Sequence, residues 1–157
     1  LYQTEWCPAS HRVRERLTVP GVEPDRLTVE LTESSTLEDP ALAESVVRDL
    51  HALGVRIALD DFGTGYSSLS RLRELPVSTL KIDRSFLRDV PERPEAAAVV
   101  TAILQLARAL GRTAVAEGVE TEAQRAFLAA EQCPLAQGFF LGVPVPPEEI
   151  ARPILKV

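Results

Sequence analysis

The sequence lacks methionine altogether and contains only two cysteines among its 157 residues. Cys7 and Cys133 show neither C-x-x-C nor Cys/His spacing, so we expect two free thiols in a reducing compartment, without a disulfide between them. Because the chain begins at Leu1 and has no methionine, we expect it to be a piece of a longer protein.

Long apolar runs and clusters of basic residues are also missing. The most apolar segment, residues 96–110, is interrupted by Gln105 and Arg108, so we expect no membrane span in this chain. A net charge of −6 argues against nonspecific binding to nucleic acid or an anionic membrane, although a bound cation could still recruit an anionic ligand. We expect a cytoplasmic domain, whose parent protein could itself be anchored to a membrane.

The sequence does contain a regular alternation of strand and helix patterns, in a chain long enough to bury roughly 70% of its unfolded surface. Strand patterns occupy residues 27–31, 55–60, 77–82, 113–117 and 136–141; helix patterns occupy residues 42–53, 67–75, 95–110 and 121–130, with a last helix beginning at Pro147. This alternation is typical of parallel strands joined by right-handed crossovers. It fits either a doubly wound sheet or a large part of a (β/α)8 barrel.

Four of the expected strands end with an ionisable side chain on the face opposite their apolar residues: Glu30, Asp60, Lys81 and Glu117. In a barrel that second face is the interior, and active sites lie at the C-terminal mouth. Three carboxylates and an ammonium that converge there need compensation for their desolvation. A divalent cation is the simplest compensation, and ligands that are all oxygen favour Mg²⁺ or Mn²⁺.

The adjacent acids Asp60 and Asp61 can coexist if both bind metal. Asp61 would then leave the alternation of the strand as the chain enters the loop. Two metals would accommodate the pair better than one, and could bind a scissile phosphate and activate water. Each feature alone has an ordinary interpretation: a solvated turn for the Asp pair, a capping residue for Glu30, a surface charge for Lys81. The recurrence on four strands in one phase favours a site.

Five motifs carry a family resemblance: VELTES, ALDDFGTGYSSL, LKIDRSF, AEGVETEAQ and AQGFFLG. Their order and spacing between residues 27 and 144 resemble the EAL family, bacterial domains that hydrolyse cyclic di-GMP to linear pGpG. The resemblance implies an α/β fold, the C-terminal five β/α units of a partial (β/α)8 TIM-type barrel. Residues 27–157 would be the C-terminal part of an EAL domain, and residues 1–26 a poorly matched segment with a helix near residues 11–19.

The resemblance also implies roles for single residues. Glu30 and Glu117 look like ligands of a first metal, Asp61 like a ligand of a second, and Asp60 like a ligand that both share. Lys81 resembles the lysine that holds or deprotonates the attacking water, and Gln137 resembles a glutamine of the same site. The loop at residues 62–68 is implied to gate metal binding, with anchoring acids and flexible glycines at Glu33, Glu120, Gly63 and Gly65.

Two segments of the family pattern are absent. Neither the E-x-L strand nor the N-x-S strand is present, and each supplies a metal ligand in the family. Val143 precedes Pro144, where the family usually has arginine or lysine. We therefore expect the isolated chain to be inactive, because misplaced groups can cost about 100-fold in rate.

Three functions stay open. The first is a metal-dependent phosphodiesterase acting on cyclic di-GMP, and the second is a degenerate module that binds cyclic di-GMP or a protein partner without hydrolysis. The third, an enolase-like or aldolase-like barrel enzyme, needs a substrate for which the sequence offers no feature. The resemblance further implies a homodimer in the parent protein and an upstream sensory or GGDEF domain. An incomplete barrel would also expose sheet edges, so we expect the isolated chain to self-associate.

Overall fold

The computed structural model describes residues 22–32, 40–65 and 69–146. Its strands are β1 (Thr28–Thr32), β2 (Arg56–Phe62), β3 (Thr79–Ile82), β4 (Thr113–Ala116) and β5 (Leu135–Ala136). Its α-helices are α3 (Pro40–Ala52), α4 (Leu69–Glu74), α5 (Pro94–Ala109) and α6 (Glu122–Ala130), and two short 3-10 helices are η1 (Pro24–Arg26) and η2 (Arg84–Phe86). The helices expected near residues 11–19 and at Pro147 lie outside the described residues.

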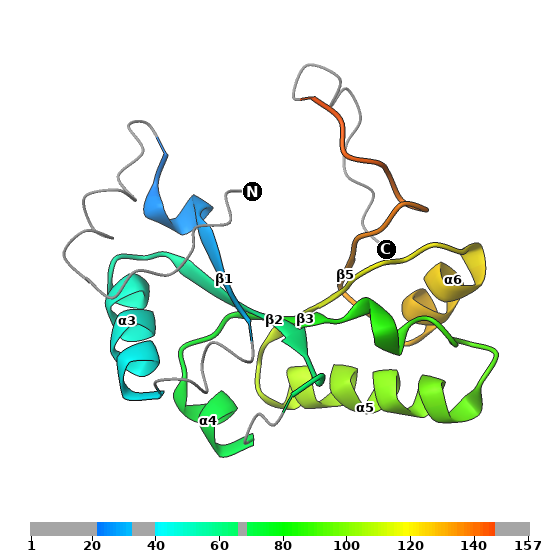
Figure 1. The fold of residues 1–157 in the computed structure, drawn as a ribbon, viewed down its shortest axis with the longest axis horizontal. Coiled ribbons are helices and arrows are strands. Elements are labelled where there is room, and N and C mark those ends of the chain that lie inside the picture. The colour runs from blue at the N-terminus through cyan, green and yellow to red at the C-terminus, as the bar shows by residue number, and fades with distance from the viewer. Residues whose placement is uncertain (1–21, 33–39, 66–68, 147–157) are drawn as a thin grey trace.

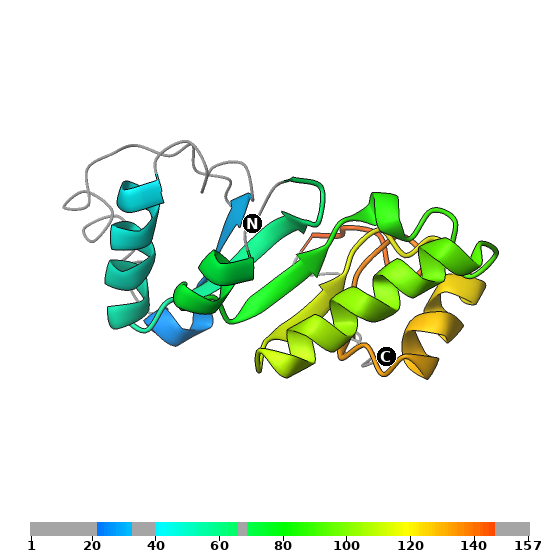
Figure 2. The ribbon, with the colours of Figure 1, turned by 90° about the horizontal axis from the view of Figure 1, so that it is seen from below.

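The strands form one parallel sheet in the order β1-β2-β3-β4-β5, so each strand pairs with the next one along the chain. Figures 1 and 2 show α3, α4, α5 and α6 following one another along the sheet. A doubly wound sheet reverses its strand order at a switch point, whereas a (β/α)8 barrel adds strands sequentially. The observed order therefore decides between the two folds left open by the sequence, and the chain is a partial (β/α)8 barrel.

The core lies between the sheet and its helices. Ile57 and Leu59 of β2 and Leu80 and Ile82 of β3 point to this side and are buried, as period-two alternation requires. The helices contribute apolar side chains at helical spacing to the same cluster, among them Val47, Leu50, Val100, Leu104 and Leu128. The opposite face of each strand is thus left free for other side chains.

The helix ends follow local sequence signals. After α3 the N–H of Gly54 donates to His51 O and the N–H of Val55 donates to Leu50 O, which is a Schellman motif. The same pair of bonds closes α5 around Gly111. At the start of α6, Thr121 and Gln124 form both reciprocal bonds of the capping box that the sequence predicted.

The strand expected at residues 136–141 is wrong beyond Ala136. Pairing with β4 ends there, because the next residues turn: the N–H groups of Leu141 and Gly142 both donate to Gly138 O. Phe139 and Phe140, which fall within the expected strand, are both exposed. The other strands and helices expected within the described residues are confirmed, with bounds that differ from the expected ones by at most two residues.

Two edges of the sheet have no partner strand among the described residues. β1 pairs only with β2, and β5 pairs only with β4. The geometry that motivated the expectation of self-association is therefore present, and the expectation itself stays a prediction. Within the same part of the chain, no helix is both long and apolar enough to cross a bilayer.

Candidate metal centre

Lys81 is surrounded by three carboxylates. Its Nζ lies 2.8 Å from Glu30 Oε2, 2.9 Å from Asp60 Oδ1 and 2.8 Å from Glu117 Oε1. Only 7% of the Lys81 surface is exposed, so the ammonium has exchanged nearly all its water for these three partners. The four strand-end residues that sequence alternation placed on one face are therefore brought together.

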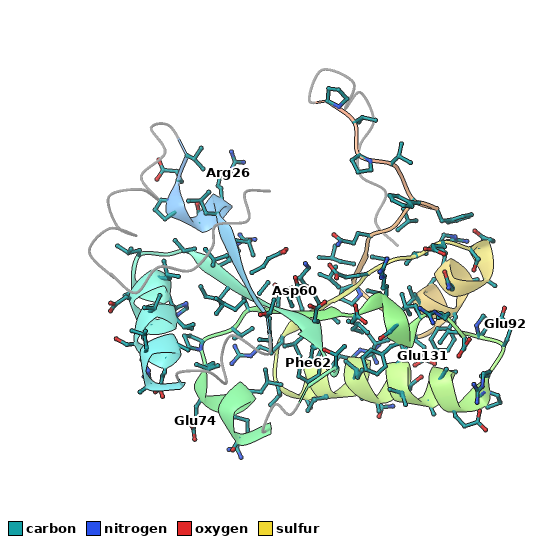
Figure 3. The ribbon with its side chains drawn as sticks, viewed as in Figure 1. Arg26, Asp60, Phe62, Glu74, Glu92 and Glu131 are labelled. Carbon is teal, nitrogen blue, oxygen red and sulfur yellow. The ribbon has the colours of Figure 1, made fainter. Side chains whose placement is uncertain are left out.

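Neighbouring strands bring these four side chains together. Glu30 lies in β1, Asp60 in β2 and Lys81 in β3, and Glu117 directly follows β4, where its N–H continues the ladder by donating to Ile82 O. Each of these residues follows or precedes an apolar residue that points to the helices, so alternation turns its side chain to the other face. Figure 3 shows Asp60 near the centre of the sheet, with Phe62 closer to α5.

A β-bulge at the end of β2 explains how two adjacent acids serve one site. Leu59 pairs with Leu80 and Phe62 pairs with Ile82, so β2 carries one residue more than β3 over this stretch. In a regular strand Asp61 would share the buried face of Leu59. Instead Asp61 has a φ of 54°, which aspartate tolerates better than most residues, and buried Phe62 takes the core position. The prediction that Asp61 leaves the alternation is confirmed.

The carboxylates of Asp60, Asp61 and Glu117 form a group that could hold a metal ion. One oxygen from each lies within 4.8 Å of the other two. With Glu30, four negative charges face the single positive charge of Lys81, which leaves three negative charges in excess. The donors are all carboxylate oxygens, so the residues fit a hard divalent cation such as Mg²⁺ or Mn²⁺.

The pKa values reflect this balance between burial and charge. For Lys81, burial alone would lower the pKa, but its hydrogen bonds to Glu117, Glu30 and Asp60 outweigh burial and raise the pKa above the ordinary value. For Glu117, burial raises the pKa, although the hydrogen bond from Lys81 opposes the rise. The ammonium form of Lys81 is therefore strongly favoured in this arrangement.

The pKa of Asp61 is also raised, by burial and by neighbouring negative charge. Burial raises its pKa, the carboxylates of Asp60 and Asp83 raise it further, and Lys81 opposes them. Asp83 was not singled out from the sequence, although it stands in the K-I-D motif. Its side chain caps η2 by accepting from the N–H of Ser85 at 3.0 Å, which with other local hydrogen bonds lowers the pKa of Asp83 despite its burial.

Gln137 lies beside the carboxylate cluster. Its Nε2 donates to Glu117 Oε1 at 2.5 Å, so one carboxylate oxygen receives both this amide and the Lys81 ammonium. The backbone holds Gln137 in place, because its N–H donates to Ala116 O and its C=O accepts from the N–H of Val119. The prediction that Gln137 belongs to the site agrees with this geometry.

Only some of the residues expected to gate metal binding lie within the described part of the chain. Gly63 directly follows β2, and Gly65 lies two residues further along the chain. A Cβ at Gly63 would lie 2.9 Å from the Phe86 ring. Glu120 is exposed, and its backbone N–H donates to Gln124 Oε1. Glu33 and residues 66–68 lie outside the described residues, so their roles stay predictions.

Comparisons with known proteins show the family to which the chain belongs. A family model described as EAL domain matches residues 4–144. The bifunctional diguanylate cyclase/cyclic di-GMP phosphodiesterase MucR of Pseudomonas aeruginosa is 47% identical over 138 residues, which cover 88% of this chain and 20% of MucR. The chain belongs to the EAL domain family.

Two solved structures share both the fold and much of the sequence. The PaMucR phosphodiesterase in complex with c-di-GMP is similar with a TM-score of 0.83 and 46% identity, over 89% of this chain and 57% of that chain. Klebsiella pneumoniae BlrP1 in complex with manganese and cyclic di-GMP has a TM-score of 0.78 and 32% identity, over 85% of this chain and 34% of that chain. The present chain thus spans little more than half of the first structure.

Proposed function

We propose that the chain carries the catalytic acids of a divalent-metal phosphodiesterase that hydrolyses cyclic di-GMP to linear pGpG. Water adds to one phosphorus, the P–O3′ bond breaks, and the released O3′ takes a proton. The observation that carries the proposal is the Lys81 ammonium held by three carboxylates at successive strand ends, with a fourth carboxylate, Asp61, beside them. Family relatives in complex with c-di-GMP support the choice of substrate.

Asp60, Asp61 and Glu117 would hold metal, and Glu30 would complete the set from the neighbouring strand. Bound Mg²⁺ or Mn²⁺, in a site of two ions, would supply Lewis acidity at the phosphate and lower the pKa of water. The excess of three negative charges favours cation binding before the anionic substrate arrives, because a dianionic ligand would otherwise be repelled.

Lys81 and Gln137 would position the attacking water. Lys81 offers an ammonium close to three carboxylates, and Gln137 offers an amide whose Nε2 is already directed at Glu117. Hydrogen-bond donors fixed at the reacting centre stabilise the charge that develops on oxygen in the transition state. We propose that the chain alone has little activity, since the E-x-L and N-x-S ligands are absent from it. We also propose that it is a cytoplasmic domain and that its parent protein acts as a homodimer under an upstream sensory or GGDEF domain.

The test is turnover of cyclic di-GMP to pGpG, followed by chromatography, with the protein encoded by the complete reading frame that contains this chain. We expect turnover with Mg²⁺ or Mn²⁺, none after chelation by EDTA, and a loss of at least about 100-fold in Glu30→Gln. Glu44→Gln is the matched control, because Glu44 forms an exposed ion pair with Arg48 on α3, away from the strand ends. Wild-type rates in Glu30→Gln would contradict the residue assignments.

A module that binds cyclic di-GMP without cleaving it is separated by measuring affinity and turnover on the same samples. Micromolar or tighter binding without pGpG formation in the presence of Mn²⁺ would favour that module. Rapid turnover would exclude it.

A further inference from the structure

Two polar side chains are buried among the described residues, Lys81 and Gln124. Lys81 is at the centre of the site, but Gln124 lies in the first turn of α6 and touches none of the four carboxylates in any described contact. Every polar atom of the Gln124 amide is used: Oε1 accepts from the N–H of Glu120 at 2.8 Å and of Thr121 at 3.1 Å, and Nε2 donates to Leu87 O at 2.9 Å. A buried amide is stable only when its hydrogen bonds are made in this way.

These bonds join the two segments that leave the site. The first segment runs from Lys81 through η2 to Leu87. The second runs from Glu117 through Glu120 to α6. The two segments also touch nearer the site, because a Cβ at Gly118 would lie 2.5 Å from Arg84 Cβ. The hydrogen bonds of the Gln124 amide are thus a second connection between the Lys81 segment and the Glu117 segment, farther from the carboxylates than the first.

We propose that Gln124 is a positioning residue, which keeps Lys81 and Glu117 at the separation that metal binding and hydrolysis need. This proposal rests on the function proposed above. A displacement of the Glu117 segment would also move Gln137, because Val119 accepts from the N–H of Phe140 and donates to Gln137 O. Groups that hydrogen-bond directly to metal ligands commonly contribute about 10–100-fold to metal affinity or activity, and for Gln124, which acts through the backbone, we expect the lower end of this range.

The competing interpretation is that Gln124 only caps α6. Its Oε1 belongs to the capping box with Thr121, and glutamate serves equally well at this position of the motif. The bond from Nε2 to Leu87 O is no part of the cap. The two roles can therefore be removed one at a time.

Gln124→Glu keeps an acceptor for the Glu120 and Thr121 N–H groups but loses the donor to Leu87 O. Thr121→Ala does the reverse, since it removes half of the capping box and leaves the Gln124 amide intact. In Gln124→Glu, a protonated carboxylic acid would still donate to Leu87 O. Gln124→Met excludes this outcome, because methionine provides neither the acceptor nor the donor. The added charge in Gln124→Glu would by itself strengthen cation binding, so weaker binding would run against simple electrostatics.

The experiment measures Mn²⁺ affinity by calorimetry, Tm without metal, and kcat and KM for cyclic di-GMP, all on the protein from the complete reading frame. We expect both Gln124 variants to raise the Mn²⁺ Kd about tenfold and to lower kcat by at least as much, with a smaller change in KM. Thr121→Ala should lower Tm by about 3–5 °C and leave the Mn²⁺ Kd within about twofold of wild type.

Gln124 variants that keep the wild-type Mn²⁺ Kd, or a Thr121→Ala variant that weakens Mn²⁺ as strongly as they do, would overturn the positioning role. A wild-type protein that binds Mn²⁺ and loses it in the Gln124 variants, yet makes no pGpG, would contradict the phosphodiesterase proposal and leave the positioning role standing.

Discussion

Lys81→Met is expected to reduce cyclic di-GMP turnover by at least about 100-fold, because it removes the only cation that contacts the strand-end carboxylates in the described residues. Methionine is similar to lysine in length and volume, so steric damage is small. In the absence of metal the variant leaves Glu30, Asp60 and Glu117 without a counter-charge. We expect this to lower the free energy of unfolding by up to about 3 kcal/mol, since the three carboxylates keep some contact with water.

Added Mn²⁺ should restore part of that stability, because a divalent cation replaces the missing positive charge. The rise in Tm on adding Mn²⁺ should therefore be larger for Lys81→Met than for wild type, as measured by thermal unfolding with and without the ion. Arg48→Met is the control: it removes a cation from an exposed ion pair with Glu44, and its effect should stay within about 1 kcal/mol. An equal rise in Tm on adding Mn²⁺ to Lys81→Met and to wild type would contradict the view that Mn²⁺ replaces the missing positive charge.

Gly138→Ala is the second substitution with a large expected effect. A Cβ at this position would lie 2.2 Å from both the N and O atoms of Val119, which are backbone atoms that no change of rotamer can move. The segment must then separate from Val119 and lose the bonds that hold Gln137 beside Glu117. We expect a loss of about 1–3 kcal/mol in the free energy of unfolding and at least about a tenfold loss of turnover.

Gly142→Ala separates this close contact from a general effect of replacing glycine in the same segment. A Cβ at Gly142 meets no atom within 4 Å, so this variant should match wild type in both Tm and turnover. The measurements are thermal unfolding and pGpG formation on the two variants in parallel. Similar behaviour of Gly138→Ala and Gly142→Ala would show that the contact with Val119 is unimportant.

Much of the fold could be predicted because its signals are local and periodic. The alternation in residues 57–59 and 80–82 gave both the strands and the faces of Asp60 and Lys81, and the glycines at 54 and 111 marked two helix ends. α6 also ends in a Schellman motif, but with Gln132 at positive φ in place of glycine, so that end carried no such signal. The strand expected at residues 136–141 includes Phe139 and Phe140, but both are exposed and the chain turns at Gly138.

The sequence predicted which residues form the site but not how they are arranged in space. Alternation placed four charged side chains on one face, yet the bulge at Asp61 depends on the register between β2 and β3, which no single strand encodes. In the same way the sequence revealed the capping box at Thr121 and Gln124 but not the bond to Leu87, since that contact joins segments far apart in the chain. The strand order that distinguishes a barrel from a doubly wound sheet also follows only from such long-range pairing.

Metal binding by the acids around Lys81 is the central claim, and its most direct measurement is an anomalous difference map from crystals of the complete protein grown with Mn²⁺. We expect a peak about 2–2.3 Å from carboxylate oxygens of Asp60, Asp61 and Glu117, and its loss in Asp60→Asn. A map with no peak between these residues at saturating Mn²⁺, or a peak unchanged in Asp60→Asn, would contradict the claim.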